Sequence, residues 1–307
     1  MTMNDTLLLE LHSIRDFIRY GITSFNRAGI YFGHGTDNAL DEAANLVLHA
    51  LKLPHDLPGH YMESRLTSEE KRAVLELFRR RIEERIPAAY LTGEAWFANM
   101  QFHVDSRVLV PRSPIAELIE QHFAPWLESD NVHRILDMCT GSGCIGMACA
   151  QYFPDAMVDC VDISADALEV AQQNLQRHAH LQDQVRLVQS DLFAALDGER
   201  YDLIVSNPPY VDSMDLAAMP VEFEHEPALG LGSGEDGLDA TRVILREAAE
   251  HLTEHGVLVV EVGASAANLE QAFPEVPFMW LELARGGDGV FLFTRDQLIE
   301  YADQFAG

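Results

Sequence analysis

Residues 134–150, RILDMCTGSGCIGMACA, decide the fold of this chain. An apolar run leads into three closely spaced glycines, Gly141, Gly143 and Gly146, which are followed by small apolar residues. This order is typical of a buried strand, a tight glycine loop and a helix whose N-terminus faces a ligand. The next strand-like run ends at Asp162, 21 residues after Gly141, where a carboxylate can accept hydrogen bonds from ribose hydroxyls. The pattern therefore predicts a binding site for a nucleoside or a dinucleotide.

Strand-like and helix-like runs alternate along the chain beyond residue 113. Strands are predicted at residues 134–139, 158–162, 185–189, 201–206 and 256–262, and helices at residues 113–123, 143–152, 165–177 and 240–251. Such alternation is typical of an α/β fold in which helices cover both faces of a parallel sheet. Two further strands are predicted at residues 278–284 and 290–294, with only the turn at residues 285–289 between them. A turn this short cannot cross the sheet, so the last strand should run antiparallel.

The first 87 residues predict a small helical domain. Apolar residues recur at helical spacing between Leu7 and Ile22, and a second amphipathic run follows the turn-rich stretch FGHGTDN at residues 32–38. Residues 67–70, TSEE, form a capping box that should begin another helix. The three arginines at residues 79–81 are expected on the solvated face of that helix, and His34 is expected to be a turn residue. Residues 88–112 alternate apolar and polar side chains, which predicts a β-hairpin linker.

The composition describes an ordinary globular protein without a membrane span or a metal site. The chain has 307 residues and a mean hydropathy of −0.05. No apolar run approaches the roughly 18 residues of a membrane-spanning helix, and acids among the first apolar residues argue against a signal peptide. The four cysteines include no C-x-x-C pair. We expect them to be buried small side chains in a reducing cytoplasm, and not zinc ligands or disulfides.

The net charge of −28 is distributed unevenly along the chain. Residues 1–100 carry −3, whereas residues 101–307 carry −25, with 35 acidic and 10 basic residues. Tight binding to nucleic acid requires cations that neutralise phosphates, and the second part of the chain has few. The charge therefore argues against DNA and favours a basic protein as partner.

Residues 207–210, NPPY, follow the predicted strand 201–206 directly and are called the NPPY motif below. A proline donates no N–H and biases the residue before it toward extended backbone, so two in succession make the motif stiff. It presents an amide side chain, bare carbonyl oxygens and an aromatic ring. Such a set of groups suits a small, planar ligand that donates hydrogen bonds.

An NAD-dependent dehydrogenase is the main alternative, because the three glycines and Asp162 match its fingerprint literally. Three features favour S-adenosylmethionine instead. Asp137 precedes the glycines, where a carboxylate could reach an ammonium group but would repel a pyrophosphate. The NPPY motif lies at the same carboxyl edge of the predicted sheet, and an antiparallel last strand is unlike most dehydrogenases.

Several motifs resemble the class I methyltransferases that modify the side-chain nitrogen of glutamine in proteins. They are DMCTGSG at residues 137–143, Asp162, SDLF at residues 190–193, NPPY at residues 207–210 and EVG at residues 261–263. FGHGTDN, RVLVPRSPI at residues 107–115 and HEPALGL at residues 225–231 are similar to the branch that acts on the third large-subunit ribosomal protein. The branch that acts on release factors usually has PRPET after the arginine, where this chain has Arg112-Ser-Pro114. Cys139 replaces the first glycine of the family motif, so a contact there would be made by its backbone.

The resemblance implies a Rossmann-like, seven-stranded methyltransferase domain at residues 113–307 that uses S-adenosylmethionine, preceded by a helical substrate-recognition domain at residues 1–87 and the linker at 88–112. Expected cofactor contacts are Asp137, Cys139, Thr140, Gly141, Ser142, Gly143, Asp162, Asp191, Leu192 and Asn207. Expected substrate contacts are Asn207, Pro208, Pro209 and Tyr210, of which Asn207, Pro208 and Tyr210 are the expected catalytic residues. The Asn207 side-chain oxygen and the Pro208 carbonyl would accept the two N–H bonds of a glutamine amide, while Tyr210 packs against the amide plane.

The expected partner is a basic ribosomal protein that has not yet been assembled into the ribosome. The acidic stretch at residues 211–239 is expected to frame the entrance for the glutamine, with Glu222, Glu224 and Glu226 facing that protein. Alternatives are a release factor as substrate or, because adenine also presents a planar N–H₂ group, an adenine-N6 DNA methyltransferase. The sequence does not predict the oligomeric state.

Overall fold

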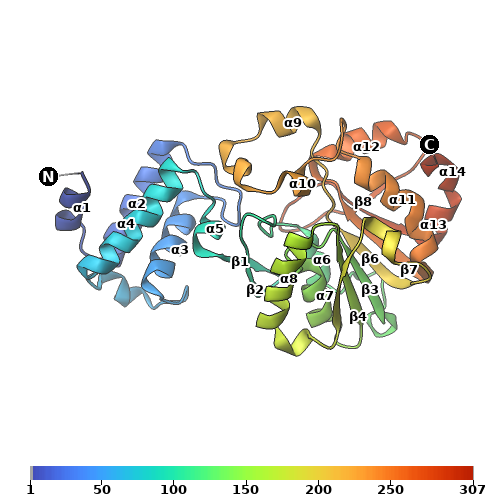
Figure 1. Cartoon of the computed structure of the whole chain (residues 1–307), viewed down its shortest axis with the longest axis horizontal. Helices are drawn as coiled ribbons and strands as arrows, with labels where there is room; N and C mark the ends of the chain where they lie inside the picture. The colour runs from blue at the N-terminus through green and yellow to red at the C-terminus, as the bar shows by residue number, and fades with distance from the viewer. Residues whose placement is uncertain (1–2, 307) are drawn as a thin grey trace. The chain divides into compact units, whose positions relative to one another are not determined.

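The computed structural model describes residues 3–306, which form two compact units (Figure 1). The first unit holds the chain up to Glu94 together with Pro220–His225, and the second holds Ala95–Met219 together with the chain from Glu226 onward. The helical part therefore continues past residue 87, and a short piece of the chain after the NPPY motif belongs to it. None of the helices in the described range has the length and apolar character needed to cross a bilayer.

The first unit is built from helices around an apolar core. Its elements are α1 (Met3–Glu10), α2 (Ile14–Ala28), α3 (Ala39–Leu51), η1 (Gly59–Glu63), α4 (Ser68–Glu83), α5 (Ala88–Thr92) and η5 (Val221–His225). The predicted helical run between Leu7 and Ile22 is divided in two, because Ser13 forms a capping box with Asp16 and begins α2. The capping box of Thr67 and Glu70 begins α4, as predicted. Phe17, Phe25 and Phe78 are fully or almost fully buried between these helices.

The prediction of a solvated arginine run on α4 is wrong for one of its three residues. Arg79 and Arg80 lie at the surface and form ion pairs with glutamates of the same helical region. Arg81 has no exposed surface, and its guanidinium contacts the buried carboxylate of Glu42. His34 lies in a bend between two glycines, as predicted, but its ring is buried against Phe223 with the ring centroids 4.5 Å apart.

The second unit contains a seven-stranded sheet with the order β5-β4-β3-β6-β7-β9-β8. The strands are β3 (Arg134–Met138), β4 (Met157–Asp162), β5 (Val185–Gln189), β6 (Tyr201–Ser206), β7 (Leu252–Glu261), β8 (Met279–Trp280) and β9 (Val290–Thr294). The first five are parallel, whereas β9 runs antiparallel to β7 and to β8. The predicted parallel sheet with an antiparallel last strand is confirmed.

Two predicted strand segments differ from the structure. The strand predicted at residues 278–284 is only two residues long, because the N–H groups of Ala284 and Arg285 donate to the Glu117 carboxylate and not to a neighbouring strand. The predicted hairpin is short as well: it consists of β1 (Glu94–Phe97) and β2 (Met100–His103), since residues 88–92 are helical and form α5.

Helices cover both faces of the large sheet (Figure 1). One face packs against α6 (Ile115–Glu120), α7 (Cys144–Tyr152) and α8 (Ala165–Arg177), and the other against α11 (Asp239–His251), α12 (Ala266–Ala272), α13 (Arg295–Glu300) and α14 (Ala302–Phe305). The short helices η2 (Ser129–Asn131), η3 (Ala179–Leu181), η4 (Leu192–Ala195), α9 (Ser213–Ala218), α10 (Ala228–Leu231) and η6 (Gly263–Ser265) lie in the connections. This arrangement leaves the carboxyl edge of the parallel strands for a binding site.

Candidate active site

The glycine loop joins β3 to α7 and adopts left-handed backbone conformations. Gly141 has a φ of 55° and Gly143 a φ of 80°, values that favour glycine. Cys139, which replaces the first glycine of the family motif, has a φ of 62°. A side chain in this region costs about 1–2 kcal/mol. The backbone therefore keeps the geometry that a glycine would adopt, and the cysteine is strained to retain it.

Asp137 lies at the end of β3 and is completely buried beneath the glycine loop. Its Oδ2 accepts hydrogen bonds from the Gly146 N–H, at 2.8 Å, and from the Thr140 hydroxyl. Burial raises the pKa of Asp137 to about 7. Within residues 3–306, no donor reaches its Oδ1 atom. Asp137 therefore holds the loop against α7 and retains one buried acceptor for a further hydrogen bond.

The third glycine of the loop sequence is required by close packing beneath it. A Cβ atom on Gly146 would lie 2.2 Å from the Cys160 sulfur and 3.0 Å from the Asp137 carboxylate. Cys144, Cys149 and Cys160 are buried, in agreement with their expected role as small core side chains. Burial raises the pKa values of all three thiols. Cys139 is only partly buried.

Asp162 lies at the end of β4, beside the glycine loop. Its Oδ2 accepts from the Gly141 N–H at 2.8 Å, and its Oδ1 accepts from the Ser164 N–H at 2.9 Å. Burial raises the pKa of Asp162. Because each carboxylate oxygen has two lone pairs, both can still accept a hydrogen bond from a ligand. Leu192 follows at the end of β5 with a φ of 45°, next to the exposed Asp191.

The NPPY motif is the next group at this edge, since β6 lies beside β3 in the sheet. The Ser206 hydroxyl donates to the Met138 carbonyl at 2.8 Å and joins the two strand ends. The Asn207 side chain is partly exposed, and in the described range neither it nor the Pro208 carbonyl takes part in a hydrogen bond. The structure therefore brings the glycine loop, Asp162, Leu192 and Asn207 to one edge of the sheet.

Tyr210 is fixed by residues outside the predicted set of site residues. Its hydroxyl donates to the Glu261 Oε1 at 3.2 Å, and the Ser113 hydroxyl donates to the other oxygen of Glu261 at 2.5 Å. The Tyr210 carbonyl accepts from the Ser265 hydroxyl at 2.5 Å. Burial raises the pKa values of both Tyr210 and Glu261. Glu261 lies in the EVG motif and Ser113 in RVLVPRSPI, but these motifs by themselves indicate no contact with Tyr210, and Ser265 lies in no motif.

The expectation that Glu222, Glu224 and Glu226 all face a partner is wrong for two of them. Glu222 is 2% exposed; its carboxylate accepts from the Tyr31 N–H at 3.1 Å and lies 3.3 Å from the Arg85 guanidinium. Its neighbour Phe223 packs against Tyr31 and His34. His34 of the FGHGTDN stretch and the adjacent Tyr31 therefore form part of the surface against which η5 packs.

Glu226 is the second exception, and its partners lie in the second unit. Its carboxylate accepts two hydrogen bonds from the Arg112 guanidinium, at 2.6 and 2.8 Å, and one from the Val110 N–H at 3.1 Å. Glu224 is exposed. The acidic stretch after the NPPY motif is therefore anchored by internal ion pairs, and only Glu224 of the three remains available to a partner.

Asp162→Ala is expected to weaken cofactor binding by about 1–3 kcal/mol, the scale for a hydrogen bond to a charged group. Calorimetry with S-adenosylmethionine and S-adenosylhomocysteine measures the loss of binding free energy. In the same experiment, NAD should bind neither the unaltered protein nor the variant. Asp155→Ala, at an exposed aspartate outside the site, is the control. Micromolar binding of NAD without binding of the sulfonium compound would contradict the expectation that the cofactor is S-adenosylmethionine.

The strand order and directions, with a glycine loop after the first strand of the sheet and an acid after the second, are those of a class I methyltransferase. The family model of the methyltransferase small domain matches residues 119–222, from α6 to η5. Two curated relatives extend the match over almost the whole chain. A ribosomal protein uL3 glutamine methyltransferase of Xanthomonas campestris is 55% identical over 95% of this chain and 94% of its own. One of Francisella tularensis is 49% identical over 97% of this chain and 95% of its own.

The chain therefore belongs to the family of ribosomal protein uL3 glutamine methyltransferases. Among solved structures, the catalytic domain of hMettl16, in complex with an RNA hairpin, is similar with a TM-score of 0.49 and 17% identity. That match covers 73% of this chain and 80% of the other.

Proposed function

We propose that this protein transfers a methyl group from S-adenosylmethionine to the side-chain nitrogen of a glutamine in ribosomal protein uL3. The observation that carries the chemistry is the pair of hydrogen-bond acceptors in the NPPY motif, the Asn207 side-chain oxygen and the Pro208 carbonyl, next to the glycine loop. The relatives named above support the choice of substrate.

The residues at the carboxyl edge fit S-adenosylmethionine by their donor and acceptor sets. The buried Asp137 Oδ1 is an acceptor without a partner in the described range, which suits an ammonium group. Asp162 is the proposed acceptor for the ribose hydroxyls, and Leu192 the proposed contact of the adenine. Cys139, Thr140, Gly141, Ser142 and Gly143 are proposed to contact the cofactor through the loop, with Asp191 at its margin. When bound, the cofactor supplies an electrophilic methyl group.

An amide nitrogen is a poor nucleophile because its lone pair is delocalised into the carbonyl group. Acceptors at Asn207 and Pro208 would fix both N–H bonds, so that the lone pair points toward the methyl group. They would also stabilise the positive charge that develops on nitrogen during transfer. Tyr210 is proposed to pack against the amide plane, with Glu261 holding its hydroxyl. The rate acceleration would then come from positioning and electrostatics, without a dedicated general base. As the N–C bond forms, the S–CH₃ bond breaks and the sulfur departs as a neutral thioether, and the methylated nitrogen, made acidic by its positive charge, releases one of its two protons to water.

The substrate is proposed to be the free ribosomal protein, recognised with the help of the helical unit before the ribosome is assembled. The −25 charge of residues 101–307 supports a basic partner, because such a surface attracts a basic protein and repels one coated in RNA. The same charge argues against adenine in DNA as the methyl acceptor.

Methyl transfer is expected to be fast on free uL3 and poor on intact large subunits. Its kcat/KM should fall by at least about tenfold between roughly 0.02 and 0.5 M salt, because salt screens the attraction between opposite charges. The assay follows radiolabel from the cofactor into free uL3, intact subunits, a release factor and DNA. Preference for the release factor would show that the substrate is a release factor and not uL3. Label in DNA alone would overturn the proposed protein methylation.

A further inference from the structure

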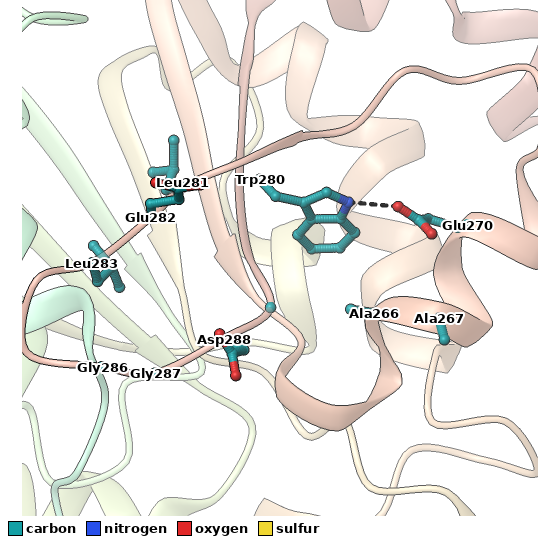
Figure 2. Close-up of a pocket in the computed structure, with 11 residues that line it drawn as sticks. Ala266, Ala267, Glu270, Trp280, Leu281, Glu282, Leu283, Gly286, Gly287 and Asp288 are labelled. Atoms are coloured by element: carbon teal, nitrogen blue, oxygen red, sulfur yellow. Dashed lines mark hydrogen bonds between the residues drawn. The ribbon is translucent and has the colours of Figure 1, made fainter.

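A cavity of about 570 Å³ lies at the carboxyl end of β8, outside the site described above (Figure 2). It is lined by Ala266, Ala267 and Glu270 of α12, by Trp280 of β8, and by residues of the segment 281–289 that includes three glycines. This volume falls within the range of roughly 300–1,000 Å³ that ligand sites in proteins occupy. The cavity is therefore large enough to receive a long side chain of another protein.

The charged side chains that line the cavity are all acidic. Glu270, Glu282 and Asp288 line it, and no lysine, arginine or histidine does. Across residues 3–306, none of these three carboxylates forms an ion pair, and the nearby Arg285 contacts Glu120 instead. Among residues 3–306, no group of three or more histidine, cysteine, aspartate or glutamate side chains could hold a metal ion. An extended organic cation thus matches the cavity better than a metal ion does.

Trp280 supplies an aromatic wall. Its indole N–H donates to Glu270 Oε1 at 2.7 Å, a hydrogen bond drawn in Figure 2, which fixes both side chains. Its ring is supported by Phe278, with the centroids 5.7 Å apart, and by Phe291, at 5.8 Å. A cation within about 6 Å of a tryptophan ring is attracted by its electron-rich face, and the aliphatic part of a lysine or arginine also packs against it.

The cavity is adjacent to the NPPY motif through two glycines in close contact. A Cβ atom on Gly289, which lines the cavity, would lie 2.3 Å from the Gly263 carbonyl oxygen. A Cβ atom on Gly263 would in turn lie 2.7 Å from the Tyr210 ring. Only a layer of backbone therefore separates the cavity from Tyr210. Because Tyr210 is three residues from Asn207, the cavity lies within the reach of residues a few positions from a glutamine held at Asn207.

We propose that this cavity binds a lysine or arginine side chain of the protein substrate, a few residues from the glutamine that is methylated. The cavity is then a specificity site for the reaction, and it rests on the function proposed above. The cavity recognises a charged residue near the glutamine, whereas the NPPY motif binds the side-chain amide of the glutamine itself. Glu282 and Asp288 supply the charge, and Trp280 supplies the surface along which the aliphatic part of the side chain lies.

The test compares two double variants that change the net charge equally. Glu282→Gln with Asp288→Asn neutralises two exposed cavity carboxylates that make no hydrogen bonds in the described range. The control, Asp183→Asn with Glu254→Gln, neutralises two exposed carboxylates near the starts of β5 and β7, at the opposite edge of the sheet. Steady-state methylation of free uL3 is measured for both and for the unaltered protein, with cofactor affinity from calorimetry.

The cavity variant should raise the KM for uL3 by at least about fivefold, with kcat and cofactor affinity within about twofold of the unaltered protein. The control should stay within about twofold in KM. In uL3, each lysine and arginine within about six residues of the modified glutamine, a reach of roughly 20 Å, is then replaced by alanine. One of these replacements should raise the KM of the unaltered enzyme and have no further effect on the cavity variant.

Equal KM values for the two double variants would overturn the cavity assignment while leaving the methyltransferase function intact. The same holds if every alanine replacement in uL3 affects the unaltered enzyme and the cavity variant equally. Failure of the unaltered protein to label any glutamine of uL3 would instead overturn the proposed function, and the cavity assignment with it. The two failures are therefore distinguishable.

Discussion

Asn207→Ala is expected to lower kcat by about 10²–10³-fold, the scale for removing one preorganised hydrogen-bond partner of a developing charge. The side-chain oxygen of Asn207 would accept from the amide N–H whose nitrogen gains positive charge in the transition state. Because that interaction strengthens as the charge develops, its loss should fall on kcat more than on KM. Radiolabel transfer to free uL3 under saturating cofactor measures the effect.

Two further measurements separate a catalytic role of Asn207 from a structural one. The Asn207 side chain makes no hydrogen bond within the described residues, so the variant should keep the thermal stability of the unaltered protein. Its affinity for S-adenosylmethionine should stay within a few fold, as measured by calorimetry. Asn131→Ala, at an exposed asparagine of the same unit, is the control and should retain full activity. Near-normal turnover of Asn207→Ala would show that the NPPY motif only shapes the backbone.

Arg81→Met is expected to lower the free energy of unfolding by about 3–5 kcal/mol, the scale for breaking a buried ion pair on one side. The Arg81 Nε lies 2.7 Å from Glu42 Oε1 and its Nη1 lies 3.5 Å from Glu222 Oε1, with all three side chains at 2% exposure or less. Its Nη2 also donates to the Tyr31 carbonyl at 2.7 Å. Methionine would fill much of the volume but leave two carboxylates buried without this cation. Urea unfolding, with hydrogen exchange in α3 and α4, measures the loss.

Arg79→Met is the matched control for that prediction, because Arg79 lies two residues away on the same helix. It pairs with Glu76, Glu83 and Glu84 at the surface, where ion pairs contribute about 1 kcal/mol or less. Adding Glu42→Gln to Arg81→Met should restore part of the lost stability, since one uncompensated charge is removed. Equal losses for Arg79→Met and Arg81→Met would contradict the assignment of a buried network.

Patterns that are local in sequence determined the architecture of this protein. Residues 134–150 predicted strand, loop and helix, and the structure has β3, the glycine loop and α7 there. The five residues between the predicted strands at 278–284 and 290–294 are too few to cross the sheet, so the sequence alone required an antiparallel last strand. Asp162 and the NPPY motif could be placed together because the carboxyl ends of parallel strands share one edge of the sheet.

The partners of individual charged residues were decided only by the tertiary structure. Arg81 belongs to a run that is polar in sequence, yet it is buried because α3 and η5 bring Glu42 and Glu222 to it. Glu226 was expected at the surface but is paired with Arg112, which lies 114 residues away in the sequence. The free energy of burying a charge depends on the partners that distant segments supply, and a local sequence pattern does not identify those partners. Helix and strand periodicities repeat within a few residues, which is why the sequence alone determined the sheet and the motif positions but not these ion pairs.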